Sequence, residues 1–506
     1  MRKILVLYMN EMIKVIKKVS VIIILSIMIV AVICTGALMK TQDYISKQNS
    51  TQYNNSDDAK KQMQEELSTE QKRIKKIDEL LPKTKPEDIP ALLEEKVSSS
   101  LRIDIIKIAI EKKIELNSPD YRAKSLNKIY ELKIQMRLSI NTRKQTADII
   151  GLIQGYENVV NQNDLKSFIA LENDQINSDK SVTADEKKIS IESNELRLKL
   201  NITGQPQKGS YSDSSEVAIS RIETEKKSLL YNLDLSGSQL PLTPEARENV
   251  KNDLAVNTYK LEHGISEIGN GLESSGIGEK LAYNSMLGIG LFMIVLLLMI
   301  LAGASVSNEI SSGSIKSLII SPAKRWKIFL AKFLAIISIG VIAGLILYIV
   351  TSLIYGAFFG FSSGSNYIFA VNGVAYELNF YIYKLAYLAA SFLVVLVFAT
   401  FAFMLSILTR NTAVSVSISM GIYFAGNVAN TVLMNFVKGE WLKFSPFNHF
   451  NVAEKMFPND ALNQLATSGN FGAPKTSLAF SLIYIGVLMV CMLYTGLDSF
   501  NRRDIK

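Results

Sequence analysis

The residues best suited to specific chemistry lie in the segment SVSNEISSGSIKSLIISPAKRWKIFLAK, which covers positions 305–332. It predicts a short helix over 308–319, a Ser-Pro turn that stops this helix, and a basic helix start that leads into an apolar run. Arg325 and Lys332 are seven residues apart, so they lie two turns apart on one helix face. From the residues alone, the segment is either a specific contact surface or a membrane-anchored turn whose Lys and Arg side chains pair with lipid phosphates.

A second group of polar residues, Asn427, Asn430 and Thr431, interrupts a later apolar run. Their spacings of three and four residues place all three side chains on one face of a helix. Within a membrane, such a stripe either lines a pathway for a substrate or forms hydrogen bonds to neighbouring helices. Of these two interpretations, helix packing is favoured.

The chain is poor in residues that bind metals or act as nucleophiles. Its only histidines are His263 and His449, so neither a His-rich metal site nor a His-based catalytic triad is expected. Cys34 and Cys491 both lie in apolar runs, where they are expected to be small core residues rather than partners in a disulfide or zinc site. The sequence therefore predicts no metal site, no bound cofactor and no enzymatic activity for this chain.

The charged residues divide the chain into two chemically different parts. Residues 41–281 contain 35 Lys or Arg and 39 Asp or Glu, a net charge of −4, whereas the other 265 residues contain 20 and 8, a net charge of +12. With 48% hydrophobic residues and a mean hydropathy of +0.18, the chain is too apolar for a disordered protein. This pattern indicates a polar domain inserted into a very hydrophobic one, and it excludes a simple soluble globule and a secreted disulfide scaffold.

Six apolar stretches are long enough to cross a membrane, which takes roughly 20 residues of helix. Each must be helical, because lipid offers the backbone no other hydrogen-bond partner. The third stretch is overlong and has Lys332 near its start, so it is expected to tilt or to break. In chain order, the predicted transmembrane helices cover residues 19–39, 284–304, 328–358, 385–408, 413–436 and 478–497.

Lysine and arginine in the short flanks set the orientation of these helices, because such residues are enriched on the cytoplasmic side. They cluster in the first 18 residues, in the loop 305–327, at Arg410 and in the tail 498–506, and all four flanks fall on one side of a six-helix count. The N- and C-termini are therefore predicted to be cytoplasmic. The segments predicted to lie outside the cell are 40–283, 359–384 and 437–477.

Residues 1–18 predict a short amphipathic helix. Lysines fill one side, and the apolar residues of the other side are Ile4, Leu5, Tyr8, Met12, Val15 and Ile16. Such a helix is suited to lying on the inner leaflet, although a charged flank that only sets the topology explains the pattern equally well. The apolar stretch that follows is longer than the roughly 7–15 residues of a signal-peptide core, so it is interpreted as a retained helix.

Residues 40–283 predict a mainly α-helical, coiled-coil-like domain. Apolar residues in the stretch 62–81 follow heptad spacing, and the stretch 101–114 carries two apolar stripes, as a helix buried on two sides does. The stretch 189–202 fits either a strand or a helix, and a helix is favoured. Carboxylates interleave with lysines as on solvated helix faces, and basic pairs lack aromatic neighbours, which argues against nucleic acid as a partner. The predicted fold class is an all-α membrane protein with one transmembrane helix before this domain and five after it.

The segment 305–332 resembles the loop between the second and third membrane helices of the type-2 ABC exporter permease family. The matching pattern is E-x3-G-x2-K-x-L-x3-P-x2-R-x6-K. An amphipathic N-terminus, the Ser445-Pro446-Phe447 sequence after the fifth helix and the tail FNRRDI also resemble this family. The resemblance covers residues 1–40 and 282–506, and it leaves the long insert between them unexplained.

The resemblance implies the membrane half of an ATP-driven exporter. Members of the family pair as homodimers or heterodimers and dock on separate cytoplasmic ATPase subunits, which bind ATP and Mg²⁺. Residues 305–322 would hold a coupling helix, and residues 1–18 would be the family's connecting helix beside the same contact. The expected cargo is a peptide, a lipid or another amphipathic molecule.

The same resemblance assigns roles to individual residues of the loop. The first three of them would face the ATPase, the proline and the arginine would shape the turn, and the last lysine would anchor the third helix at the inner membrane boundary. These implied coupling residues are Glu309, Gly313, Lys316, Pro322, Arg325 and Lys332.

An ATPase of its own is not expected in this chain. A phosphate-binding loop needs G-x-x-x-x-G-K-[ST], in which glycine amides cradle the phosphates and the lysine reaches them. The nearest approach is Gly271 to Gly276, followed by Ile277 where the motif requires lysine. A transporter built on this chain would therefore depend on a partner for ATP hydrolysis.

A second interpretation is a non-transporting membrane scaffold or receptor with an extracellular coil, similar to phage-infection-protein-like or secretion components. The loop pattern favours the exporter. The sequence leaves open the cargo, the direction of transport, the choice between homodimer and heterodimer, and the role of residues 41–281. Its Ile/Lys/Asn-rich composition is weakly indicative of a bacterium, in which the protein would be a multi-pass protein of the cell membrane.

Overall fold

The computed structural model divides the chain into two compact units. One, here called the apolar unit, comprises Met1–Asp43, Ile277–Phe369 and Glu377–Lys506, and the other, the polar unit, comprises Tyr44–Gly276 with Ala370–Tyr376. The structure describes residues 2–53, 56–138, 143–205, 214–235, 239–265, 277–312, 324–361, 366–436, 440–457 and 476–502.

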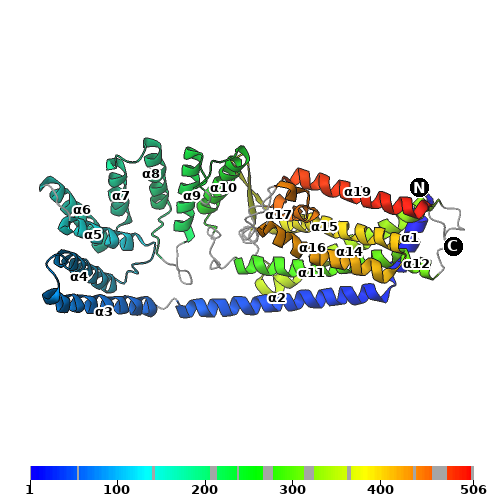
Figure 1. Ribbon diagram of the computed structural model, residues 1–506, viewed down its shortest axis with the longest axis horizontal. Helices are drawn as coiled ribbons and strands as arrows, with labels where there is room; N and C mark the ends of the chain where they lie inside the picture. Colours follow the sequence, from blue (N-terminus) through cyan, green and yellow to red (C-terminus); the bar gives the residue numbers. More distant parts are fainter. Residues whose placement is uncertain are drawn as a thin grey trace. The chain divides into compact units, whose positions relative to one another are not determined.

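Helices make up nearly all of the described part of both units (Figure 1). The helices of the apolar unit are α1 (Arg2–Ile16), the first part of α2 (Val19–Tyr53), α11 (Ile277–Ser305), α12 (Ser307–Ser311), α14 (Arg325–Phe359), α15 (Phe380–Thr409), α16 (Thr412–Phe436), η2 (Glu440–Phe444), η3 (Pro446–His449), α17 (Val452–Met456) and α19 (Leu478–Arg502).

Six helical spans in the described residues are long and apolar enough to cross a membrane, which confirms the predicted fold class. They are Val19–Ile45, Ala282–Ser311, Arg325–Phe359, Phe380–Thr409, Thr412–Asn430 and Leu478–Arg502. The third, which was expected to tilt or to break, runs without a break as α14.

The core of the apolar unit is centred on α11. In its most apolar window 61% of the residues are buried, against 11% in α19, so α11 is central and α19 is peripheral. Leu297, Leu298 and Ala302 of α11 are almost completely buried, and α11 packs against α14, α15 and α16. A helix that is apolar on every side is stable only when it is surrounded by other helices or lipid. Helices α14, α15 and α16 therefore cover α11, whereas α1 and α19 pack on the outer side of these helices.

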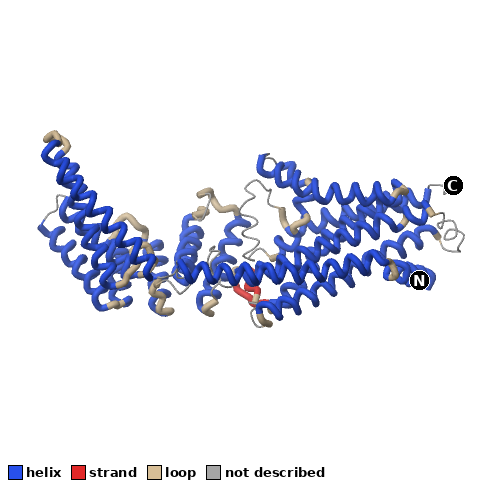
Figure 2. The backbone as a smooth tube through the Cα atoms, turned by 90° about the horizontal axis from the view of Figure 1, so that it is seen from below, coloured by secondary structure: helices blue, strands red, loops and turns tan. Residues whose placement is uncertain are grey.

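A β-hairpin follows α14, in a segment that the sequence analysis treats only as a loop. Its strands are β1 (Tyr367–Val371) and β2 (Val374–Leu378), the only strands in the described residues (Figure 2). The two residues between them, Asn372 and Gly373, have positive φ angles of 54° and 78°. Asn-Gly is the preferred pair for such a two-residue turn, because both positions need left-handed backbone.

The polar unit is a succession of helices, and from α3 to α10 each α-helix packs on the next along the chain. Its helices are the end of α2, α3 (Ser56–Leu80), η1 (Leu81–Lys83), α4 (Ile89–Lys112), α5 (Tyr121–Leu138), α6 (Arg143–Gln162), α7 (Leu165–Ser178), α8 (Ala184–Lys199), α9 (Ser214–Tyr231) and α10 (Pro244–Glu262). The stretch around 189–199 is helical, as favoured.

The polar unit contains two separate apolar clusters. One joins α3 to α7 and includes Ile106 and Leu126, and the other joins α8 to α10 and includes Ile219 and Leu261. Each cluster is built between successive helices rather than along one continuous heptad seam. The coiled-coil character predicted for the insert is therefore not confirmed, although its helical nature is.

Candidate functional site

Lys332 is the centre of a buried charge cluster in the apolar unit. It lies in the second turn of α14, and its side chain is only 2% exposed. Its Nζ donates hydrogen bonds to Glu309 Oε1 at 2.7 Å and to Glu11 Oε2 at 3.0 Å. A buried ammonium group is tolerated when carboxylates compensate its lost hydration. Lys332 thus ties α1, α12 and α14 together.

Lys14 adds a second cation to this cluster. Its Nζ lies 3.1 Å from Glu11 Oε1 and 3.6 Å from Glu309 Oε1. Burial acts to raise the pKa of Glu11, but the positive charges and hydrogen bonds of Lys332 and Lys14 outweigh it and hold that pKa below its usual value. We call Glu11, Lys14, Glu309 and Lys332 the charge cluster; its two acids and two bases leave it neutral.

Helix α1 is placed for this contact by its packing on α14. Met12 and Val15 are buried between the two helices, and the Tyr8 hydroxyl donates to Ser338 Oγ at 2.9 Å. Glu11 directly precedes Met12 and also faces α14. Lys18, at the end of this segment, is partly buried, and burial lowers its pKa, as does the charge of Lys332.

The apolar residues of α1 occupy two faces rather than the single stripe expected from the sequence. Tyr8, Met12 and Val15 of that stripe contact the apolar core, but Leu5 and Ile16 are exposed. The exposed apolar residues of α1 are Leu5, Val6, Met9, Ile13 and Ile16. A helix buried on one side by protein and apolar on another is suited to lying at a lipid interface.

The α11–α12 corner that carries Glu309 is held by a second polar network. The backbone N–H groups of Val306 and Ser307 donate to Ser406 Oγ of α15, at 3.3 and 3.0 Å. Ser307 Oγ lies 2.7 Å from Thr412 Oγ1 at the start of α16, and that hydroxyl also donates to Asn308 Oδ1 at 2.7 Å. The hydroxyl groups replace the hydrogen bonds that a bent helix loses. As a result, α12 is fixed to three membrane helices.

The remaining residues predicted for the loop are only partly visible in the structure. Arg325 begins α14, and its guanidinium donates to the carbonyl of Asn501 in α19 at 3.0 Å. Gly313, Lys316 and Pro322 lie outside the described residues. The structure therefore brings together Glu309 and Lys332 from the predicted set, and it attaches Arg325 to the C-terminal helix.

The polar stripe predicted on the fifth membrane helix is represented by Asn430 of α16. Its amide donates to Asn448 Oδ1 at 2.8 Å, and its carbonyl oxygen accepts from Ser445 Oγ at 2.9 Å. The side chains of Asn427 and Thr431 lie outside the described part of the chain. Asn430 therefore fastens α16 to the segment that contains η3.

Sequence reasoning missed Glu11. It is the only acidic residue in the first 42 positions. This isolation in a basic segment is the one signal that could have identified Glu11 as a functional residue. Lys332 is likewise the only charged residue between positions 328 and 358. A lone charge in an apolar or oppositely charged segment is expected to have a partner.

Within the described residues, no group of three or more His, Cys, Asp or Glu side chains is arranged to hold a metal ion. The site consists of hydrogen bonds and ion pairs between helices. These contacts hold the short helix α12 next to the long membrane helix α14 and the amphipathic helix α1.

Comparison with known proteins gives two matches. The family model described as "ABC-2 family transporter protein" matches residues 5–505. A curated relative, "Uncharacterized protein YhcI" of Bacillus subtilis (strain 168), is 25% identical over 269 residues, which are 52% of this chain and 78% of the relative. No solved structure matches the chain significantly.

Proposed function

Because the chain belongs to the ABC-2 transporter family, we propose that it is the membrane-spanning permease of an ATP-driven exporter in a bacterial cell membrane. Membership makes it a membrane subunit of an ABC transporter that works with a partner ATPase. The export direction, the coupling residues and the cargo class belong to the proposal. ATP and Mg²⁺ would be bound by the ATPase, and two permease copies would pair around the transport path.

The observation that carries the proposal is the position of Lys332 between Glu309 and Glu11. Glu309 belongs to α12, which opens the loop 305–327 that would face the ATPase. Glu11 belongs to α1, and Lys332 belongs to α14, a candidate membrane-spanning helix. One buried ammonium group thus connects the proposed docking loop to the membrane helices.

This connection suggests how ATP-driven motion reaches the membrane. Leaving a buried charge without its partner costs roughly 3–5 kcal/mol, so the three helices are expected to move together rather than separate. A push on α12 would be passed to α14 through Lys332, and to α15 and α16 through Ser406 and Thr412. Closure of the ATPase subunits would in this way rearrange the permease dimer.

The family resemblance supplies the roles proposed for the other loop residues. Gly313 and Lys316 would contact the ATPase, and Pro322 would end the coupling helix. Arg325, held to α19 through Asn501, would add the C-terminal helix to the moving set. The cargo proposed from the family is a peptide, a lipid or another amphipathic molecule.

A co-purification experiment tests this function. The full chain is purified from its own cells in a mild detergent, as the wild type and as the Lys316→Glu variant. We expect an ABC ATPase and ATP hydrolysis to accompany the wild type, and both to fall at least tenfold with the variant. Lys83→Glu, a charge reversal at an exposed residue of the polar unit, is the matched control and should retain the ATPase.

Two results would contradict the proposal. If no ATPase accompanied the wild type, while wall or secretion proteins bound through the polar unit, the chain would be a scaffold or receptor. If Lys316→Glu and Lys83→Glu lost the ATPase equally, the loop 305–327 would not be the docking surface.

A further inference from the structure

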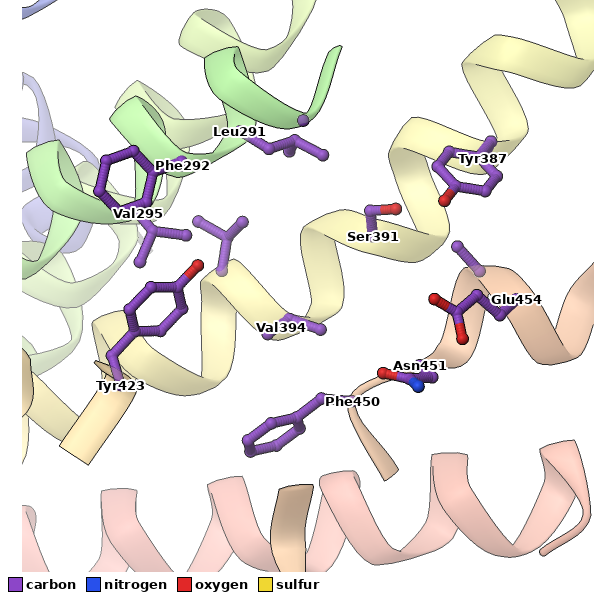
Figure 3. A pocket seen from close by; sticks show the side chains of 13 residues that line it. Leu291, Phe292, Val295, Tyr387, Ser391, Val394, Tyr423, Phe450, Asn451 and Glu454 are labelled. Carbon is purple, nitrogen blue, oxygen red and sulfur yellow. The ribbon is translucent and has the colours of Figure 1, made fainter. Parts of the chain in front are cut away.

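The apolar unit contains a cavity of about 210 Å³. It is partly open and is lined by residues of α11, α15 and α16 and of the short segment from Phe450 to Glu454, which leads into α17 (Figure 3). A cavity of about 150 Å³ is large enough to hold a benzene ring. This one can therefore accept an aromatic ring or a short branched chain, together with a small polar group.

Most of the residues that line the cavity are apolar or aromatic. Leu291, Val295 and Val394 supply aliphatic surface, and the rings of Phe292 and Tyr423 lie 6.3 Å apart between their centroids. Aromatic faces are attracted to cations as well as to other rings. The wall thus favours an apolar body, and it does not repel a positive charge.

One end of the cavity is polar. Figure 3 shows the Glu454 carboxylate and the Asn451 amide opposite Ser391 and Tyr387 of α15. Glu454 lies next to Asn451 on the η3–α17 segment, and burial raises its pKa despite the opposing influence of Asn451 and Lys455. A carboxyl group at the edge of an apolar cavity gains most from a ligand that brings its own positive charge.

The neighbouring cation is engaged elsewhere. Lys455 Nζ donates to the Asn448 carbonyl at 2.9 Å, to Thr476 Oγ1 at 2.6 Å and to Ser481 Oγ at 2.7 Å. Among the residues that the structure describes, Glu454 has no Lys, Arg or His nitrogen within 4.0 Å, the distance of an ion pair. Lys455 therefore acts on Glu454 through its charge without forming an ion pair, and the carboxyl group can still receive a cationic ligand.

We propose that this cavity binds cargo of one chemical class, amphipathic molecules that carry a single cationic group on an apolar or aromatic body. The body fills the space between Leu291, Phe292, Val394 and Tyr423, and the cation lies against Glu454. This inference rests on the proposed function, since it assigns the cavity to the transported molecule. It narrows the cargo from amphipaths in general to cationic ones.

Benzyltrimethylammonium is a suitable probe, because it combines one ring with one permanent positive charge. Its neutral counterpart, neopentylbenzene, has the same shape with carbon in place of nitrogen. Binding of both is measured by equilibrium dialysis with the purified full chain in dodecyl maltoside, whose headgroup carries no charge. We expect the wild type to bind the cation at least tenfold more tightly than the neutral compound.

Two variants test the contribution of the Glu454 charge and that of the cavity volume separately. Glu454→Gln keeps the shape and should reduce that tenfold preference to about twofold or less, while binding of neopentylbenzene is unchanged. Val394→Phe fills the cavity and should weaken both compounds. Glu377→Gln, which removes the same charge from an exposed position on β2, is the control and should bind like the wild type. Size-exclusion chromatography and thermal unfolding establish that each variant is folded.

The inference is overturned if Glu454→Gln binds the cation as tightly as the wild type, or if Glu377→Gln loses as much affinity. Added phosphatidylcholine, whose headgroup carries the same trimethylammonium group, shows by competition whether a lipid or a free cation is the occupant. Neither measurement involves the ATPase. If the cavity did not bind the cation, the co-purification result would still support the exporter function. If no ATPase co-purified, the binding result would still describe the cavity.

Discussion

For Lys332, the sequence and the structure provide different information about the same residue. In the sequence it is a lone charge at the start of an apolar run, and the family resemblance adds that it anchors a membrane helix. The structure adds the partners, Glu11 and Glu309, which are 321 and 23 positions away. Sequence reasoning selected Glu309 and Lys332 without pairing them, and it missed Glu11. Pairing depends on how α1 packs on α14, which periodicity alone does not specify.

The charge cluster predicts the effect of removing its cation. Lys332→Met leaves the carboxylates of Glu11 and Glu309 with only the half-exposed Lys14 as a counter-charge. We therefore expect a loss of up to about 3–5 kcal/mol of stability and a lower Tm in detergent. Lys324→Met, at an exposed lysine just before α14, should leave the Tm within a degree or two. Equal Tm values for the two variants would show that the cluster does not stabilise the fold.

Removing both carboxylates together with Lys332 tests the role in folding and the role in coupling separately. The triple variant Glu11→Gln, Lys332→Met, Glu309→Gln also removes both carboxylates and leaves only Lys14, whose side chain is 54% exposed and can be hydrated. Much of the lost stability should therefore return. If the cluster transmits motion, ATP hydrolysis by the co-purified complex should nevertheless lose its response to the permease. A triple variant with a restored Tm and a wild-type response would contradict the coupling role.

Glu225 in α9 predicts a pH dependence in the polar unit. Burial, aided by the charge of Asp253, raises the pKa of Glu225 to about 8 from its usual 4.5, against the opposing Arg221 and Asn257. The folded protein therefore holds a proton that the unfolded chain releases between these pH values. Stability should fall as pH rises through that window, by about 1.4 kcal/mol per pH unit at most for one proton.

Hydrogen exchange of the α9 and α10 amides measures this effect. Exchange protection, after correction for intrinsic rates, should decrease between pH 5.5 and pH 8 in the wild type. Glu225→Gln should flatten the dependence, because its side chain does not titrate, while Glu248→Gln at an exposed position of α10 should not. A wild-type slope that persists in Glu225→Gln would assign the dependence to Asp253, whose pKa burial also raises.

At the level of elements, hydrophobic runs predicted the membrane helices well, because lipid forces any long apolar segment to be helical. Amphipathic and irregular elements were harder. Residue spacing predicts a single apolar stripe on α1, whereas the structure shows two apolar faces, one buried and one exposed. The β-hairpin was missed although Asn372-Gly373 marks its turn. The hairpin is short and lies in a loop between two membrane helices, where the hydropathy of the flanking helices dominates the sequence pattern.

Close packing between α11 and α16 predicts that Gly303 cannot be enlarged. A Cβ atom at this position would lie 2.6 Å from Val416 Cγ2 and 3.3 Å from Ser415 Oγ. Gly303→Leu should therefore cost about 1–3 kcal/mol and lower the Tm of the full chain. Gly486→Leu in α19 is the matched control, because nothing lies within 4 Å of its Cβ position. An unchanged Tm for Gly303→Leu would show that the two helices do not touch there.

For the whole molecule, the uneven charge distribution predicted two parts, and the chain does divide into an apolar and a polar unit. The sequence could not give the internal architecture of the polar unit. Heptad-like spacing suggested a coiled coil, but short clusters between successive helices bury the same apolar residues. Spacing reports that a helix has an apolar side, not which partner covers it.

The orientation of the whole chain is the remaining prediction, and the coupling proposal depends on it. The lysine and arginine flanks predict that the loop 305–327 is cytoplasmic and that the polar unit lies outside the cell. In a Cys34→Ala, Cys491→Ala background, a membrane-impermeant maleimide should label Ser178→Cys in intact cells, because Ser178 is an exposed residue at the end of α7. Lys324→Cys, also exposed, should react only after the cells are permeabilised. The reverse pattern would put the charge cluster on the side without ATP, and no ATPase could then act through α12.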